Sequence, residues 1–109
     1  MTSAYREYYI CGMRIIALNT LKNYWTKHPD TRLPLCEWYE KVIKAEWKSF
    51  KDIKRDFNST DYVGNQRYVF NIKGNQHRLV AAIKFIPALV YIRFIGTHKE
   101  YERINVKFI

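Results

Sequence analysis

The spacing of large apolar residues changes near the middle of the chain, and this change limits the folds that the chain can adopt. Between positions 35 and 42 these residues recur at the i, i+3, i+4 and i+7 spacing of a helix that buries one face. Between positions 67 and 72 they alternate instead, with Tyr68, Phe70 and Ile72 on one side, as in a strand that buries one face. Helices followed by strands predict an α+β domain, in which two to three helices pack on one face of an antiparallel sheet.

The first half of the chain predicts a short strand and three helices. Residues 14–17 form an apolar run suited to a strand, and Asn19 or Thr20 can cap the helix that follows. That helix ends at His28, since the residue before a proline avoids the helical conformation. Pro34 starts the second helix. Residues 49–52 resemble a capping box, with Asp in place of Glu, that opens a third helix through about Phe57.

The second half predicts an antiparallel meander of three strands. The strands are expected at residues 67–72, 77–86 and 89–95, and residues 58–61 and 64–65 are expected as turns that precede them. Gly74-Asn75 and Pro87-Ala88 can supply the turns between the strands. The helices would cover one face of this sheet, and the other face would be open to a ligand.

Charge and composition narrow the possible functions. Of the 109 residues, 48% are hydrophobic and 17% aromatic, which excludes a disordered chain and fits one small domain. The net charge of +9 is typical of a protein that binds a polyanion such as a nucleic acid, with a basic protein kept soluble by its lysines as the alternative. The most apolar stretch, residues 79–96, contains Lys84, Pro87 and Arg93, so it predicts two strands and no membrane span.

The beginning of the chain differs in pattern from the rest. Residues 1–12 are irregular and Met13 precedes the first regular element, so we expect an N-terminal extension at 1–12 and the domain at 13–109. The first twelve residues contain no continuous apolar core, so no secretory signal is expected. Cys11 and Cys36 have neither metal-binding nor redox spacing, and we interpret both as reduced thiols of a cytoplasmic protein.

Several segments together resemble the HigB family of RelE-like toxins. Their order and spacing agree from about Met13 to Ile104, and V-F-N-I-x-G-N followed by I-R-F-x-G-T-H-x-E-Y is specific in combination. Members of the family often have an aromatic residue where His77 stands and Asp where Glu102 stands. The segments that carry the resemblance are Trp25–Asp30, Trp38-Tyr39, Ala45–Lys48, Arg67–Ile72, Gly74-Asn75, Arg78-Leu79 and Ile92–Tyr101.

The resemblance implies a RelE-like fold and an endoribonuclease that cleaves mRNA on the ribosome during translation. It implies as partners the mRNA, the ribosome and a cognate HigA-like helix-turn-helix antitoxin, and operator DNA only indirectly through that antitoxin. Because this chain is basic, we expect the antitoxin to be acidic where it contacts the toxin. The resemblance implies no cofactor.

His98 is the first candidate for the chemistry of RNA cleavage. Cleavage without a metal requires a base for the 2′-OH proton, a cation beside the phosphate and an acid for the leaving 5′-oxygen. The sequence offers neither a carboxylate cluster nor paired histidines, so no metal site is expected. His98 follows a strand end, where an imidazole can face a cleft and exchange protons near neutral pH. Spacing alone favours a capping or surface histidine, and the resemblance favours the catalytic role.

Three neighbouring side chains complete the expected catalytic group. Arg78 alternates onto the face of its strand opposite the core, where a guanidinium can hold a phosphate with two hydrogen bonds, or simply be solvated. Tyr101 lies three residues after His98 and is expected to position the substrate or assist proton transfer, with a core aromatic as the alternative. Lys99 is expected to neutralise phosphate charge, with a solvated lysine as the alternative.

Further residues are expected to bind RNA away from the reaction. Lys48, Lys51 and Lys54 belong to a basic run between positions 41 and 55 that could contact RNA phosphates or form an ordinary solvated face. Lys84 lies about 20 Å along the strand from Arg78 by the usual rise per residue, so it is expected to contact the RNA backbone. Asn71 could hydrogen-bond a base.

Two other functions are compatible with the same sequence. RelE-like folds also serve as gyrase poisons, which bind a protein and cleave no RNA, and the fold alone does not distinguish the two. The chain could also be a catalytically silent module that binds RNA or its partner. Arg78 and the segment from His98 to Tyr101 favour the nuclease.

Overall fold

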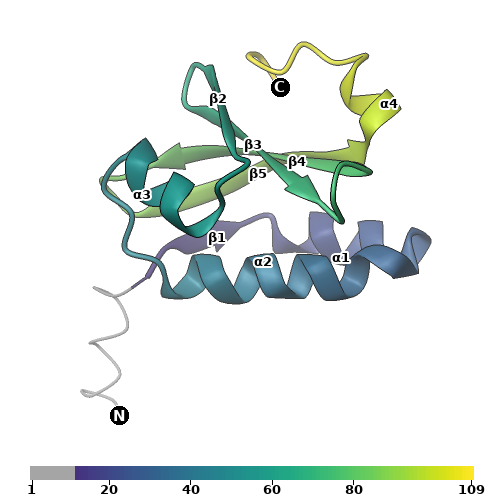
Figure 1. Cartoon of the computed structure of the whole chain (residues 1–109), viewed down its shortest axis with the longest axis horizontal. Coiled ribbons are helices and arrows are strands. Elements are labelled where there is room, and N and C mark those ends of the chain that lie inside the picture. Colours follow the sequence, from purple (N-terminus) through teal and green to yellow (C-terminus); the bar gives the residue numbers. More distant parts are fainter. Residues whose placement is uncertain (1–11) are drawn as a thin grey trace.

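A five-stranded sheet in the order β1-β5-β4-β3-β2 organises the molecule (Figure 1). The structure is a computed structural model that describes residues 12–109. Strands β2 to β5 pair antiparallel in succession, whereas β1 pairs parallel with β5. The predicted meander is therefore confirmed as the centre of a larger, mixed sheet. The strands are β1 (Arg14–Ile16), β2 (Asp61–Gly64), β3 (Arg67–Ile72), β4 (His77–Lys84) and β5 (Leu89–Thr97).

The predicted helices are present, with shifted starting points. The first helix begins after Ala17, which has a positive φ of 73°, and no side chain caps it. The second begins two residues before Pro34, which therefore lies in the first turn, where a missing N–H group needs no partner. The helical segments are α1 (Leu18–Lys27), the 3-10 turn η2 (Pro29–Thr31), α2 (Arg32–Lys44), α3 (Phe50–Asp56) and α4 (His98–Tyr101).

The hydrophobic core lies between one face of the sheet and helices α1, α2 and α3. The predicted α+β arrangement is therefore confirmed. Each of these helices contributes at least one fully buried residue, among them Leu21, Val42 and Ile53. The alternating residues of β3 and β4 supply the other side, including Phe70 and Leu79. Figure 1 shows α1 and α2 side by side beneath the sheet.

The second face of the sheet is less open than the sequence predicted. Val69 and Val80 are register partners on this face and are 4% and 0% exposed, respectively. The chain after α4 runs back above this face (Figure 1). Hydrogen bonds hold it there, since Arg67 and Arg93 both donate to the main-chain oxygen of Ile109. The centre of this face is therefore packed, and its accessible part lies near α4.

The segment expected as turns before the meander contains a strand. Residues 61–64 form β2, which pairs with β3 at the edge of the sheet. Tyr62 explains this pairing, because its ring centre lies 4.9 Å from that of Tyr68 across the two strands. The turn itself is displaced by one residue to Asn65 and Gln66, both at positive φ as a tight hairpin requires.

The N-terminal prediction falls largely outside the described residues. The expected extension covers positions 1–12, of which only Gly12 is described, and Cys11 also lies outside. Cys36 is a half-buried free thiol on α2. None of the helices in residues 12–109 has both the length and the apolar composition that a transmembrane segment needs.

Candidate functional site

Arg78 and Tyr101 meet where α4 packs against the start of β4. The guanidinium carbon of Arg78 lies 5.9 Å from the centre of the Tyr101 ring, and its Nη1 donates to the main-chain oxygen of Asn75 at 2.9 Å. Both side chains are half-buried. Arg78 pairs in register with Gly96, two residues before His98 on the continuing chain. The structure therefore brings the start of β4 and the segment from 98 to 101 together.

A capping box fixes the start of α4. The hydroxyl of Thr97 accepts from the main-chain N–H of Glu100 at 3.2 Å, and the carboxylate of Glu100 accepts from the N–H of Thr97 at 2.8 Å. The N–H of His98 donates to the main-chain oxygen of Gln76 in the turn before β4. These bonds position the first turn of α4 relative to the β3–β4 turn.

His98 and Lys99 face outward from this turn. The His98 side chain is 48% exposed, and its Nε2 lies 2.9 Å from a carboxylate oxygen of Glu102. A carboxylate at this distance can fix the orientation and the tautomer of an imidazole. Lys99 is exposed. The geometry leaves both side chains accessible to a polyanion that approaches along α4.

The Tyr101 hydroxyl lies in an environment that keeps it protonated. Burial raises its pKa above the ordinary value of 10.0, the nearby charge of Arg78 lowers it, and the charge of Asp61 raises it again. The net direction is upward, so the phenol is a hydrogen-bond donor at neutral pH. Asp61 belongs to β2, which the sequence predicted as a turn, so no pattern placed this carboxylate near Tyr101.

The other predicted RNA-binding residues are distributed along the molecule. Lys48 and Lys51 are exposed at the start of α3, and Lys84 is exposed at the end of β4 opposite Arg78. Lys54 has a structural contact, since its Nζ donates to the main-chain oxygens of Asn58 at 2.6 Å and Thr60 at 3.3 Å. Figure 1 shows α3 and α4 toward opposite ends of the sheet, so these lysines are separate from the Arg78 region.

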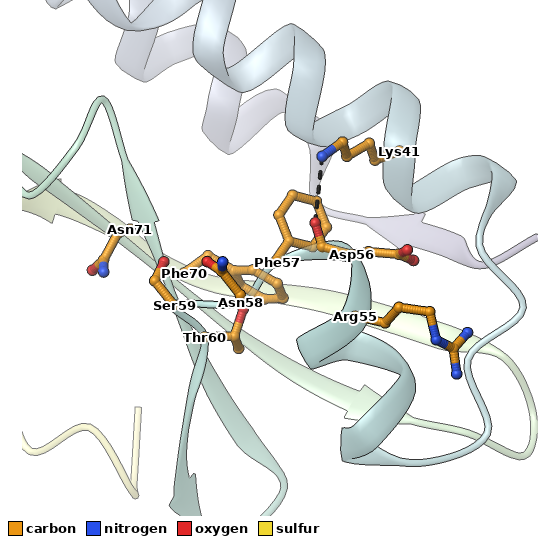
Figure 2. A pocket seen from close by; sticks show the side chains of 9 residues that line it. All are labelled: Lys41, Arg55, Asp56, Phe57, Asn58, Ser59, Thr60, Phe70 and Asn71. Carbon is orange, nitrogen blue, oxygen red and sulfur yellow. Dashed lines mark hydrogen bonds between the residues drawn. The ribbon is translucent and has the colours of Figure 1, made fainter.

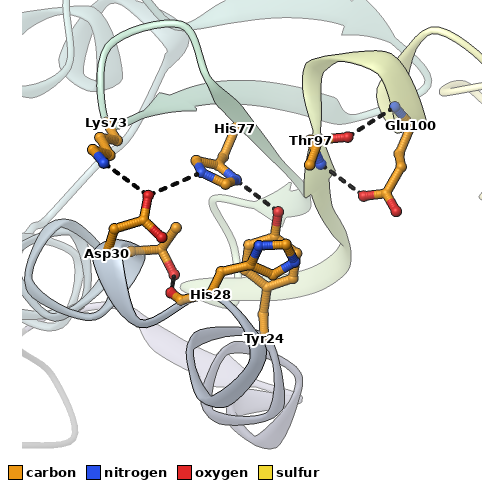
Figure 3. Close-up of polar contacts among 8 residues, drawn as sticks. Tyr24, His28, Asp30, Lys73, His77, Thr97 and Glu100 are labelled. Atoms are coloured by element: carbon orange, nitrogen blue, oxygen red, sulfur yellow. Dashed lines mark hydrogen bonds and ion pairs between the residues drawn. The ribbon is translucent and has the colours of Figure 1, made fainter.

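A polar cluster on the helix side of the sheet contains two histidines. The Nδ1 atom of His77 lies 2.6 Å from the Tyr24 hydroxyl, and its Nε2 lies 3.7 Å from Asp30 (Figure 3). Asp30 also accepts from Lys73 at 2.8 Å. The ring centres of His28 and His77 are 5.6 Å apart. The pair comes from residues far apart in sequence, which no local pattern reveals.

Burial dominates the electrostatics of this cluster. It lowers the pKa of His77, with Asp30 opposing this shift and the charges of His28 and Lys73 adding to it. Burial likewise raises the pKa of Tyr24 to about 12, assisted by the charges of Glu100 and Asp30. His77 is therefore a neutral, buried imidazole that joins α1 to the β3–β4 turn. Within residues 12–109, no three His, Cys, Asp or Glu side chains gather in the manner of a metal site.

A hollow of about 360 Å³ opens beside β3, in the loop after α3. Figure 2 shows Lys41 reaching over it from α2, Arg55 on one side and Asn71 on the other, with Asn58 and Ser59 between them. The Lys41 ammonium donates to the main-chain oxygen of Asp56 and lies 5.1 Å from the centre of the Phe57 ring. The sequence predicted a turn at residues 58–61 and gave no indication of a pocket there.

The structure also shows which signals in the sequence were overlooked. Thr97-His-Lys-Glu100 has the S/T-x-x-E form of a capping box, so the start of α4 was readable from the sequence. The expected capping box at 49–52 is replaced by a bond to the residue before the N-cap. Asp52 accepts from the N–H of Lys48 at 2.8 Å, while the Ser49 side chain makes no cap bond.

Comparison with known proteins identifies relatives over most of the chain. The model of the HigB toxin family, described as the RelE-like toxic component of a toxin–antitoxin system, matches residues 31–104. The mRNA interferase toxin HigB of Escherichia coli K12 is 34% identical over 93 residues, which cover 83% of this chain and 88% of the relative.

Two further relatives agree with this match. The mRNA interferase HigB of Shigella flexneri is also 34% identical over 93 residues, with the same coverage of 83% and 88%. The mRNA interferase HigB of Escherichia coli O6:H1 is 24% identical over 95 residues, covering 85% of this chain and 92% of the relative. The matched region contains β2 to β5 and α4, and with them Arg78, His98 and Tyr101. This chain belongs to the HigB family of RelE-like toxins.

Proposed function

We propose that this chain is an endoribonuclease that cleaves mRNA on the translating ribosome, as the toxin of a toxin–antitoxin pair. The observation that carries the proposal is the contact between Arg78 and Tyr101 next to His98 on a chain of net charge +9. The relatives named mRNA interferase support the substrate class. The site supplies a cation, a neutral phenol and an accessible imidazole, which are the groups that RNA cleavage requires.

The reaction follows from the chemistry of these groups. A base removes the proton from the 2′-OH, the 2′-oxygen forms a bond to phosphorus, and the bond from phosphorus to the 5′-oxygen breaks. An acid returns a proton to that 5′-oxygen, so a 2′,3′-cyclic phosphate and a 5′-OH end result. His98 is the acid or the base, and Arg78 stabilises the charge that builds on the phosphate oxygens. Tyr101 donates a hydrogen bond that positions the substrate, and Lys99 neutralises phosphate charge.

The partners follow from the charge and from the reaction. The exposed Lys48, Lys51 and Lys84 contact RNA phosphates and help dock the protein on the ribosome, which orients the mRNA for in-line attack. An acidic surface of a helix-turn-helix antitoxin opposes the basic toxin. The protein acts in the cytoplasm, where translated mRNA is found, and side chains carry out the acid–base and charge-stabilising work in place of a metal.

Primer extension on a translated mRNA tests the proposal. We expect wild-type protein to cut only when ribosomes are present, and His98→Ala to lower the cleavage rate about 100-fold or more. Arg78→Lys keeps the charge but loses the planar pair of donors, so an intermediate rate is expected. Lys22→Ala, exposed on α1, is the control and should cut normally.

Two results would contradict the proposal. Full cleavage by His98→Ala would remove the acid–base assignment while leaving the nuclease. Growth arrest in cells without any mRNA cleavage would reject the nuclease in favour of a gyrase poison on the same fold.

A further inference from the structure

We propose that the hollow beside β3 is a binding site for one nucleotide of single-stranded RNA, separate from the cleavage site. The inference rests on the proposed function and adds a second contact to the same substrate class. The hollow measures about 360 Å³, within the range of roughly 300–1,000 Å³ found for small-ligand sites. Its lining combines cations, amides and an aromatic ring, which are the groups that hold an unpaired nucleotide.

The cations of the hollow suit a phosphate. Lys41 and Arg55 both line it, against the single carboxylate of Asp56. Arg55 also pairs with Asp52 at 2.6 Å, so Lys41 is the cation that remains for a phosphate. The Asp56 carboxylate accepts a hydrogen bond from the indole N–H of Trp47 at 2.8 Å, so one of its oxygens already has a donor within the protein. Lys41 is exposed and lies above the Phe57 ring, where its ammonium can contact a phosphate at the rim of the hollow.

The amides of the hollow suit a base edge. Asn58 and Asn71 each offer a donor and an acceptor, the combination that hydrogen-bonds the Watson–Crick or Hoogsteen edge of an unpaired base. The Thr60 hydroxyl also lines the hollow. It is 1% exposed and finds no hydrogen-bond partner among residues 12–109. A buried hydroxyl without a partner is destabilising, and a bound polar group would satisfy it.

The loop that forms the hollow is fixed before any ligand binds. Lys54 holds the main-chain oxygens of Asn58 and Thr60, and the N–H of Thr60 donates to the main-chain oxygen of Phe57 at 3.1 Å. These bonds involve the backbone and leave the Asn58 side chain at the surface. A preformed site of this kind binds without the cost of ordering the loop.

The hollow lies close to the expected cleavage site. Asn71 on β3 is the register partner of Arg78 on β4, and paired residues on antiparallel strands lie about 5 Å apart. A strand of RNA that passes from α4 over Arg78 therefore meets Asn71 next and the hollow beyond it. The end of α3 lines the hollow through Arg55 and Asp56, and Lys51 is exposed on the same helix.

Anisotropy of a labelled 12-nucleotide single-stranded RNA tests this binding site directly. The full-length His98→Ala protein serves as the starting point, so that no residual cleavage of free RNA alters the probe. Adding Asn58→Ala or Lys41→Ala should raise Kd about 10-fold, the change expected for loss of a hydrogen-bonded or charged contact. Asn23→Ala, an exposed amide on α1, is the matched control and should leave Kd unchanged. Thermal unfolding of each variant establishes that it is folded.

Cleavage mapping then distinguishes the two sources of RNA. If the hollow holds mRNA, Asn58→Ala with His98 intact should change which bases flank the cuts on a translated transcript. If it holds ribosomal RNA, the flanking bases stay the same and co-sedimentation with ribosomes weakens. Either result supports a nucleotide site. Unchanged Kd, flanking bases and co-sedimentation in folded Asn58→Ala and Lys41→Ala proteins would overturn it.

This test separates the site from the cleavage proposal. Persistent cleavage by His98→Ala would reject the catalytic assignment. The hollow would then be tested only by the bases that flank the cuts on ribosome-bound mRNA. Loss of cleavage in His98→Ala, together with wild-type behaviour of both hollow variants, would reject the hollow and keep the nuclease.

Discussion

Arg78 is positioned before any substrate arrives. An arginine side chain carries five N–H donors in a rigid plane, and the hydrogen bond to Asn75 uses one of them. The Tyr101 ring beside the guanidinium restricts it further. Little side-chain freedom remains to be lost when a phosphate binds, which favours Arg over Lys at this position.

His77 predicts a pH dependence of stability. Its pKa in the folded protein lies below the ordinary 6.5, so the unfolded chain takes up this proton at a higher pH than the folded chain does. The contribution of His77 to the free energy of unfolding is therefore complete above about pH 6.5 and is lost as the pH falls toward its folded pKa. His77→Gln does not titrate, so thermal unfolding between pH 7.5 and 5.0 should change less in this variant than in wild type.

The surroundings of His77 define the control for this experiment. Asp30, His28 and Lys73 are charged or titratable neighbours, and Asp30 has a lowered pKa because Lys73 donates to it, so it stays charged over this pH range. Asn23→Ala removes an exposed side chain that does not titrate and should retain the wild-type pH dependence. Equal pH profiles for His77→Gln and wild type would show that the buried imidazole is not the source.

At the scale of elements, α4 depends on its capping box. It has only four residues, so hydrogen bonds within the helix contribute little to it. Thr97→Ala removes the bond to the Glu100 N–H and should lower the free energy of unfolding by about 1 kcal/mol. Because His98 and Tyr101 lie on this turn, the cleavage rate should fall as well, which is measured beside denaturant unfolding.

Thr26→Ala is the matched control for the capping variant. The Thr26 hydroxyl donates to the main-chain oxygen of Lys22 within α1, a bond that adds little to a helix. Its stability and activity should stay near those of wild type. If Thr97→Ala behaved like Thr26→Ala in both measurements, the box would have no part in holding the site.

The elements that the sequence predicted are those with a local signal. The apolar stripe of α2 and the alternation of β3 and β4 fix which side of each element is buried, and the structure agrees. β2 was missed because four residues rich in turn formers become a strand only through pairing with β3 and the contact of Tyr62 with Tyr68. The parallel pairing of β1 with β5 is equally a tertiary property.

The residues of the candidate site likewise fall into those with a local signal in the sequence and those that come together only in the fold. Arg78, His98 and Tyr101 were selected from short motifs and family resemblance, and the structure brings their segments together, although their roles remain predictions. Asp61 and the hollow beside β3 depend on segments that meet only in the folded chain. Burial of the Thr60 hydroxyl has no signature in the sequence at all.

At the scale of the whole molecule, the net charge of +9 predicts that binding to RNA weakens strongly with salt. The logarithm of the association constant should fall linearly with the logarithm of salt concentration, because each phosphate contact releases bound counterions. Lys51→Gln should reduce that slope by about 0.7, the value for one contact to a single strand. Lys22→Gln on α1 should not change it, and binding of single-stranded RNA at several salt concentrations measures both.

The parallel pairing of β1 with β5 also sets the order in which the molecule can be made. Arg14 pairs with Leu89, so β1 cannot join the sheet until β5 has left the ribosome. Arg78 and His98 come together only at the same late stage, when β5 and α4 emerge. A bacterial ribosome adds about 5–20 residues per second. For the several seconds of its own synthesis, the nascent chain lacks an assembled site.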